Sequence, residues 1–138
     1  MRSTRKTWNE KLHHSKAHKV CRLDQAFADL PAGCQMLIAS PLLVDAFLRT
    51  IPRGKSVSVR EMRASLARDH KAEHTCPLTT GIFLRIAAEA AWERFQAGES
   101  LTKVAPFWRV VEPGSPLAKK LTCGMEFIKQ QRRLEGIA

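Results

Sequence analysis

Histidine and cysteine, which bind zinc and supply nucleophiles, are grouped at two places in this 138-residue chain. Residues 14–21 read H-x3-H-x2-C and lie in a highly charged segment, whereas residues 70–76 read H-x3-H-x-C and lie where a helix is predicted to end. Both spacings are compatible with zinc ligation, but histidines at the end of a helix also complement its dipole without a metal. We expect no metal and no cofactor, and zinc at either group is the alternative.

The cysteines stand far apart, at Cys21, Cys34, Cys76 and Cys123, and no pair forms C-x-x-C. The basic N-terminal segment is not followed by the apolar run of a secretory signal, so we expect reduced thiols, a cytoplasmic protein and no membrane association. A lone cysteine is usually a small buried hydrophobic residue. A displaced nucleophile at Cys76 or Cys123 is the alternative, and it would make the protein an enzyme.

The net charge of +10 is concentrated in two segments of the chain. Residues 1–22 carry seven Lys or Arg and one acid, and residues 49–71 carry a net charge of +5, whereas residues 23–48 have three acids and no Lys or Arg. A basic surface attracts polyanions and speeds their encounter. We predict a basic N-terminal arm at residues 1–22, either DNA-binding or a solubilising tail, before one domain at residues 23–138.

Capping residues predict the starts of two helices. Ser40-Pro41 places a capping hydroxyl before a proline in the first turn, and this helix must end before Pro52. Ser58 and Glu61 form a capping box, which predicts a helix from Val59 to about His70. Helical spacing predicts Val59, Met62 and Leu66 on the inner face of that helix and Arg60, Arg63 and Arg68 on its outer face.

A further helix is predicted to follow closely, with Thr75 as its cap and Pro77 in its first turn, and to end at Gly98. Two helices joined by a short turn, the first of them basic, are compatible with a helix-turn-helix. The second helix is mostly apolar, however, whereas a helix in the major groove usually offers several polar donors to bases. Its composition is therefore more typical of a core helix.

The remaining pattern predicts an α+β fold that is mostly helical, with a small sheet. Residues 34–39 and 107–111 are each predicted to form a short strand, the second because it is aromatic and β-branched and lies between two prolines. Gly124 precedes a final predicted helix, which Gly136 ends.

The order of these elements and three short motifs resemble the DNA-binding domain of the alkylguanine-DNA alkyltransferases and of their non-catalytic alkyltransferase-like relatives. The motifs are an I-P-x-G-K turn at 51–55, the frame of P-C-H-R-V at 106–110 and a closing E-G at 135–136. Thr80-Gly81 stands where the family has two small residues near the start of its recognition helix. The resemblance covers about residues 36–136, and it implies a winged-helix-like fold and a double-stranded DNA partner.

The chain departs from this family pattern at the residues that carry its chemistry. Phe107 and Trp108 occupy the places of the nucleophilic cysteine and of the histidine that activates it, and neither can attack an alkyl carbon or accept a proton. No catalytic residue is therefore expected. Val59 replaces a tyrosine that helps rotate the target base, and Leu78 stands nearest an arginine that fills the gap left by the flipped base. An apolar side chain can also unstack DNA.

The resemblance implies a non-catalytic DNA-binding protein, and a sensor of alkylated DNA is one form of it. The predicted DNA contacts are Arg53, Lys55, Arg60, Arg63, Arg68, Leu78, Thr79, Thr80 and Arg85. A pocket left over from the family's active site is predicted at Val59, Phe107, Trp108 and Arg109. For the two aromatic side chains, stacking on a base and packing in the core are both open. The alternative from another class is a protein-interaction module that kept the fold and lost DNA binding.

Overall fold

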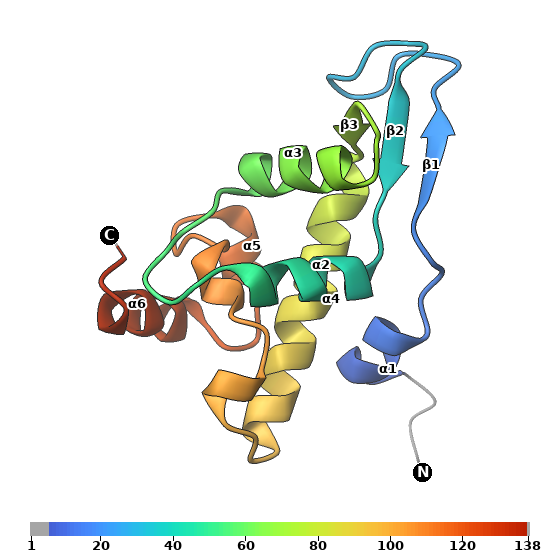
Figure 1. Ribbon diagram of the computed structural model, residues 1–138. Helices are drawn as coiled ribbons and strands as arrows, with labels where there is room; N and C mark the ends of the chain where they lie inside the picture. The colour runs from blue at the N-terminus through green and yellow to red at the C-terminus, as the bar shows by residue number, and fades with distance from the viewer. Residues whose placement is uncertain (1–5, 138) are drawn as a thin grey trace.

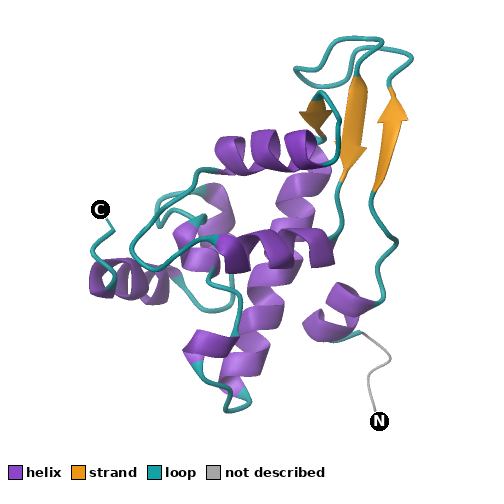
Figure 2. Ribbon diagram, in the orientation of Figure 1, coloured by secondary structure: helices purple, strands orange, loops and turns teal. Residues whose placement is uncertain are grey.

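The computed structural model describes residues 6–137 and has an α+β fold that is mostly helical. Figure 1 shows the helices filling most of the molecule, and Figure 2 shows the small sheet at one end of it. The helices are α1 (Trp8–His13), α2 (Pro41–Thr50), α3 (Val59–Asp69), α4 (Pro77–Gln96), α5 (Pro116–Lys120) and α6 (Met125–Leu134), with the short 3₁₀ helices η1 (Leu101–Lys103) and η2 (Phe107–Arg109). The strands are β1 (Lys19–Arg22), β2 (Gln35–Ile38) and β3 (His74–Thr75). The predicted α+β class, mostly helical with a small sheet, is therefore confirmed.

The three strands form one sheet in the order β1-β2-β3. β1 pairs with β2 in antiparallel fashion, with Cys21 opposite Met36, and β2 pairs with β3 in parallel, with Leu37 opposite Thr75. The strand predicted at residues 34–39 is thus β2, the central strand. Met36 and Leu37 are buried in it, so β2 links the sheet to the helices.

The described part of the predicted N-terminal arm is joined to the rest of the fold. β1 pairs with β2, and α1 packs against α4, where the Glu93 carboxylate accepts hydrogen bonds from the backbone N–H groups of Trp8 and Asn9, each at 3.0 Å. The boundary predicted between residues 22 and 23 therefore follows immediately after a strand of the sheet. Spacing within the arm could not reveal this, because its partners lie far along the chain. Residues 1–5 of the predicted arm lie outside the described residues.

The caps predicted at Ser40 and Ser58 are confirmed. The Ser40 hydroxyl accepts a hydrogen bond from the backbone of Leu43 at 3.1 Å, and α2 ends at Thr50, before Pro52. Ser58 and Glu61 make both hydrogen bonds of the capping box at the start of α3. The inward position predicted for Val59 is wrong, because the first turn of α3 extends beyond the core and leaves Val59 38% exposed.

The prediction that Thr75 caps the next helix is also wrong. Thr75 lies in β3, its hydroxyl donates to the carbonyl of Arg63 at 2.7 Å, and its own carbonyl accepts from the Arg63 guanidinium at 3.1 and 3.2 Å. The cap position of α4 is Cys76, whose side chain makes no capping hydrogen bond. Arg63 is consequently half-buried and does not point freely outward as predicted.

Helix α4 passes through the centre of the molecule, with α2 on one side and α1 beside it (Figure 1). Its C-terminal half is buried along a row of small residues, Ala87, Ala88, Ala90 and Ala91, which let neighbouring segments approach closely. Glu89 is buried among them, and its carboxylate accepts hydrogen bonds from the backbone and hydroxyl of Thr122 at 3.1 and 3.0 Å. This half of α4 is the core helix that its composition predicts.

The strand predicted at residues 107–111 does not form. Residues 107–109 make the 3₁₀ helix η2, and the backbone N–H groups of Val110 and Val111 donate to the carbonyl of Phe107 at 3.0 and 2.9 Å. These N–H groups are therefore not available to a neighbouring strand. The aromatic and β-branched composition that predicted a strand instead reflects burial, because Phe107, Trp108, Val110 and Val111 are each no more than 2% exposed.

Candidate nucleic-acid interface

The segment that stands in the P-C-H-R-V frame lies inside the core. Phe107 is 1% exposed and Trp108 is 2% exposed, and both rings pack against Phe127 with centroids about 6 Å apart. The Trp108 indole N–H donates to the Glu135 carboxylate at 2.8 Å. Of the two alternatives for these aromatic side chains, the structure shows packing in the core, so neither ring is free to stack on a base.

Arg109 connects this segment to the two other motifs of the resemblance. Its guanidinium donates two hydrogen bonds to Glu135, at 2.8 and 2.9 Å, and a third to the carbonyl of Ile51 at 2.7 Å. Gly54, in the I-P-x-G-K turn, donates its backbone N–H to Glu135 at 3.2 Å. The three motifs are far apart in the sequence, and Glu135 joins all of them in space.

Glu135 is held in its ionised form by these contacts. Burial of its carboxylate opposes ionisation, but the hydrogen bonds from Arg109, Trp108 and Gly54 outweigh burial and lower the pKa of Glu135 to about 2. The side chain is only 1% exposed. Buried carboxylates are stable when they are paired and hydrogen-bonded in this way. Glu135 and its donors Arg109, Trp108 and Gly54 therefore form a cluster that stabilises the fold, and we call this cluster the brace.

A hollow of about 370 Å³ lies between the start of α3, the N-terminal half of α4 and the segment that leads into α5. It is lined by Val59, Gly81, Leu84, Val110, Val111, Glu112, Ser115, Pro116 and Leu117. Of the four residues predicted for a pocket left over from the active site, only Val59 lines this hollow. Phe107, Trp108 and Arg109 do not line it, although the Phe107 carbonyl accepts hydrogen bonds from the backbone N–H groups of Val110 and Val111, which do.

The first turns of α4 are exposed, in contrast to its second half. Leu78 is 62% exposed and Ile82 is 52% exposed, and their spacing of four residues places them on one side of the helix. Gly81 lies beside them, and a side chain added there would meet no atom within 4 Å. Thr79 is half-buried, and Thr80 is fully buried with its hydroxyl bonded to the carbonyl of Cys76, so Thr80 cannot be the DNA contact that was predicted.

A second hollow, of about 440 Å³, runs along this exposed side of α4, between α1 and α5. Its lining combines Trp8 and Lys11 from α1 with Leu78, Gly81, Ile82, Arg85 and Ile86 from α4, and with Leu117 and Lys120 from α5. Trp8 and Lys11 lie in the basic arm, for which DNA binding was one alternative, but neither they nor Lys120 were predicted as individual contacts. A tryptophan within a strongly basic segment was the signal available for them.

The predicted basic contacts differ in how freely they can reach a ligand. Lys55, Arg60 and Arg68 are exposed. Arg53 is also exposed, although its guanidinium donates to the carbonyl of Leu134 at 3.2 Å. Arg85 is half-buried, lies over the Trp8 ring and approaches Glu89 to 4.0 Å. With Arg63 tied to Thr75, the exposed side chains of the turn and of α3 are the better candidates for phosphate contacts.

The cysteines do not offer a displaced nucleophile. Cys76 is 3% exposed. Burial of the Cys123 thiol, together with the nearby Glu89 carboxylate, raises the pKa of Cys123 to about 11. The thiolate is the reactive species, and a pKa raised in this way disfavours the thiolate at neutral pH.

The two groups of histidine and cysteine meet in the structure through one residue of each. The rings of His18 and His70 lie with centroids 4.5 Å apart. Within residues 6–137, no three His, Cys, Asp or Glu side chains are placed so that they could hold a metal ion. Over the same residues, no helix is both long enough and apolar enough to cross a bilayer.

Comparison with protein-family models, with curated proteins and with solved structures finds no match. What the interface can do therefore follows from its own side chains. It offers two exposed apolar residues on a helix, a hollow on either side of Gly81 and cations on α1, α3, α4 and α5.

Proposed function

We propose that the protein is a non-catalytic DNA-binding protein with a winged-helix-like fold related to that of the alkylguanine-DNA alkyltransferases, and that it binds alkylated duplex DNA. The observation that carries this proposal is the exposed pair Leu78 and Ile82 at the start of α4, with cations at its sides. Apolar side chains inserted between base steps unstack and kink the duplex, while Lys and Arg neutralise its phosphates.

The meeting of three motifs at Glu135 supports the relation to the alkyltransferases. The I-P-x-G-K turn, the segment at 106–110 and the closing E-G were noted as separate stretches of sequence, yet Arg109 and Glu135 bind them to one another. Buried ion pairs demand good geometry from both partners. A fold shared with the alkyltransferases accounts for the presence of all three motifs in one chain.

The same cluster supports the absence of alkyl transfer. A nucleophile must be activated by an adjacent base and must reach the alkyl carbon. Phe107 and Trp108 can do neither, and both are buried. The protein therefore binds alkylated DNA without transferring the alkyl group. The hollow beside Val59 and Gly81 offers a mostly apolar site for an unstacked base.

Binding to two duplexes of equal length and sequence, one plain and one with a single alkylguanine, tests the proposal. Fluorescence anisotropy is measured from about 50 to 200 mM salt, over which phosphate-driven affinity falls steeply. We expect tighter binding to the alkylated duplex. Lys55→Ala with Arg60→Ala should weaken binding to both duplexes and reduce the salt slope by about 1.8, since each lost phosphate contact contributes about 0.9.

The matched control is Lys103→Ala with Lys129→Ala, which removes the same charge from exposed positions on η1 and α6. It should leave the affinities within about twofold. Equal affinity for the two duplexes would reduce the protein to a general DNA binder. Absence of binding at the lowest salt would overturn the proposal altogether.

A protein-interaction module is the second candidate, and the same exposed apolar pair favours it. Leu78 and Ile82 form part of an apolar surface with Trp8 and Leu117, and exposed apolar patches also mark protein interfaces. The two candidates differ in their dependence on salt. Association through an apolar surface is insensitive to salt, whereas duplex binding weakens as salt rises.

A further inference from the structure

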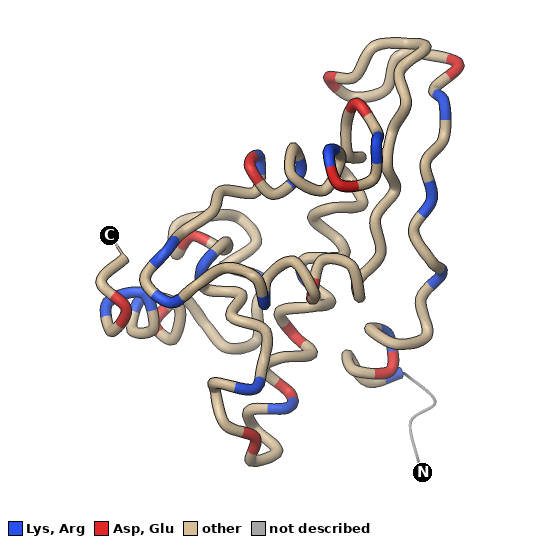
Figure 3. Tube along the Cα trace, in the orientation of Figure 1, with Lys and Arg blue, Asp and Glu red and all other residues tan. Residues whose placement is uncertain are grey.

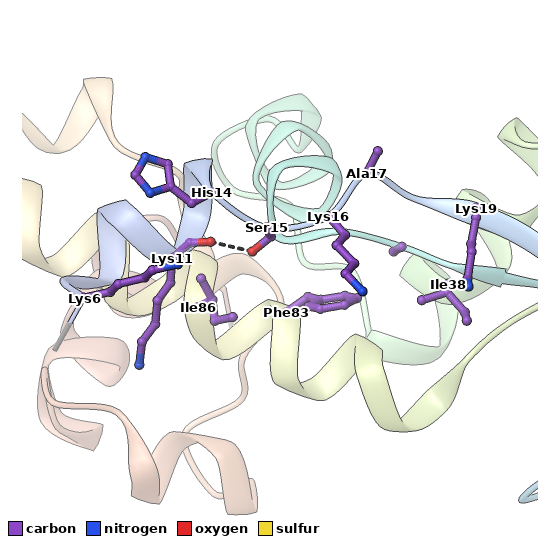
Figure 4. Close-up of a pocket in the computed structure, with 11 residues that line it drawn as sticks. Lys6, Lys11, His14, Ser15, Lys16, Ala17, Lys19, Ile38, Phe83 and Ile86 are labelled. Carbon is purple, nitrogen blue, oxygen red and sulfur yellow. Dashed lines mark hydrogen bonds between the residues drawn. The ribbon is translucent and has the colours of Figure 1, made fainter.

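A third hollow, of about 510 Å³, lies between the N-terminal segment, the end of β2 and the side of α4. Its floor is apolar and consists of Ile38 at the end of β2, Ala39 directly after it, and Phe83 and Ile86 from α4. Its volume falls within the roughly 300–1,000 Å³ that ligand sites occupy. Figure 4 shows the floor side chains together with the charged side chains around them.

The rim of this hollow is basic. It is formed by Lys6, Lys11, His14, Ser15, Lys16, Ala17 and Lys19. No Asp or Glu lines it within the described residues, and Lys16 and Lys19 take part in no ion pair there. Figure 3 shows Lys and Arg recurring along this segment as far as the end of β1. We call this site the lysine-rimmed hollow.

The backbone that carries the lysines is fixed at both ends. Glu93 holds the start of α1, and Lys19 is paired with Ile38 in the sheet. Between them, the Ser15 hydroxyl donates to the carbonyl of Lys11. The backbone positions from which the lysines extend are therefore set beside the apolar floor before any ligand arrives, which lowers the entropic cost of ordering the segment on binding.

We propose that the lysine-rimmed hollow binds single-stranded nucleic acid, with phosphates on Lys16 and Lys19 and an unpaired base on the floor around Phe83. Sites for single strands combine a basic groove that follows the backbone with aromatic side chains that stack on bases. Lysine binds phosphate as a compact point charge. The inference does not depend on the exposed pair of α4, because neither Leu78 nor Ile82 lines this hollow.

A single strand fits the hollow better than the two other polyanions that a basic rim attracts. Bases inside a duplex are stacked and paired, so a duplex can place phosphates on the rim but must first unstack a base, at a cost in free energy, to bring it to the floor, whereas a single strand offers unpaired bases directly. The carboxylates of an acidic peptide could pair with the lysines, but an acidic residue has no flat ring, whereas every nucleotide carries both a phosphate and a base. Phe83 and the apolar side chains around it are suited to such a ring.

The test compares two short labelled single strands, oligo(dT) and an abasic strand of the same length, in an anisotropy assay on the full chain. Both carry the same phosphates, so a base that reaches the floor should make oligo(dT) bind about tenfold more tightly. Lys16→Ala with Lys19→Ala should weaken both strands and reduce the salt slope by about 1.4, since a phosphate contact of a single strand contributes about 0.7. Lys103→Ala with Lys129→Ala is the charge-matched control and should leave the slope unchanged.

Phe83→Leu should narrow the preference for oligo(dT) over the abasic strand, and thermal denaturation establishes that this variant is folded. Unchanged binding in the Lys16/Lys19 variant, or equal weakening in the control, would overturn the proposal. Tighter binding of poly-glutamate than of oligo(dT) would also overturn it, in favour of an acidic peptide. Leu78→Ser with Ile82→Ser separates the two sites, because this variant should weaken duplex binding about tenfold and keep oligo(dT) binding.

Discussion

The brace around Glu135 and the first two turns of α4 are opposites in how they are held. At the brace, Trp108 and Arg109 donate every hydrogen bond that links η2 to the Glu135 carboxylate, and that carboxylate is almost completely buried. At the start of α4, Leu78 and Ile82 are more than half exposed, and no capping side chain holds the helix end.

This difference separates stability from recognition within one small fold. In the frame where the alkyltransferases carry their reactive pair, this chain has two buried aromatic side chains that stabilise the core. The exposed apolar residues stand on a helix whose other half is anchored in the core, so they are presented rigidly although they contribute little to the core themselves. Variants at the brace should therefore change the free energy of unfolding, and variants on α4 should change binding.

The largest effect is expected from Phe107→Cys with Trp108→His, which introduces the reactive pair of the alkyltransferases that the chain resembles. Loss of two buried aromatic side chains should lower the free energy of unfolding by on the order of 4 kcal/mol or more. Intact mass after incubation with an alkylated duplex should show no transferred alkyl group, because both positions stay buried. Urea denaturation measures the first outcome. A stable variant that gains the mass of an alkyl group would refute the assignment of stability to the brace and of binding to the start of α4.

The next effect is the response of the brace to acid. The pKa of Glu135 is about 2 in the folded protein and near 4.5 when the chain is unfolded. The carboxylate therefore stabilises the fold fully above about pH 4.5, and a contribution of roughly 3 kcal/mol is lost as the pH falls towards 2. Denaturation of Glu135→Gln across this range should show a flatter pH dependence, whereas the exposed Glu126→Gln should follow the parent protein. Parallel curves for the parent and Glu135→Gln would contradict the role given to the brace.

A smaller effect distinguishes two neighbouring arginines of α3. Arg63→Ala removes hydrogen bonds to the carbonyl of Thr75 and should cost about 1–2 kcal/mol of stability. Arg60 is exposed, so Arg60→Ala should change stability by less than about 0.5 kcal/mol and weaken duplex binding severalfold. Thermal denaturation and anisotropy together test the pair. The reverse pattern would show that the two side chains had been assigned the wrong roles.

The smallest effect on stability is expected from Leu78→Ser with Ile82→Ser. Exposed substitutions of this kind change the free energy of unfolding by about 0.5 kcal/mol or less, yet duplex affinity should fall about tenfold if the two side chains unstack DNA. Leu134→Ser is the matched control, because Leu134 is also 62% exposed but lies at the end of α6. An equal loss of duplex affinity in the control would remove the special role of α4.

Local rules were sufficient where a structure depends on neighbouring residues. The capping box of Ser58 and Glu61 and the hydroxyl of Ser40 involve residues three positions apart, and the sequence predicts both. Composition failed at residues 107–111, because aromatic and β-branched residues are favoured by strands and by any buried segment alike. The hydrogen-bond partners of the backbone decide between a strand and another buried segment. Here the N–H groups of Val110 and Val111 donate to the carbonyl of Phe107, so no strand forms.

The candidate site could be predicted only in part, because several of its side chains are positioned by partners that are distant in the sequence. The exposed positions of Lys55, Arg60 and Leu78 agree with the contacts predicted from charge and resemblance, although DNA binding itself stays a prediction. Thr80 and Arg63 were misplaced because a hydrogen bond to a backbone carbonyl holds each of them. The place of Trp8 beside α4 depends on contacts more than eighty residues away, which no pattern within the arm records.

The hydrogen bonds of Glu93 to α1 also set an order of events during synthesis. Trp8 and Glu93 are separated by 85 positions, and at about 5–20 residues per second a ribosome needs roughly 4–17 s to add them. α1 has only six residues, too few to be stable as an isolated helix. We therefore expect α1, although it is made well before α4, to fold only once Glu93 is in place.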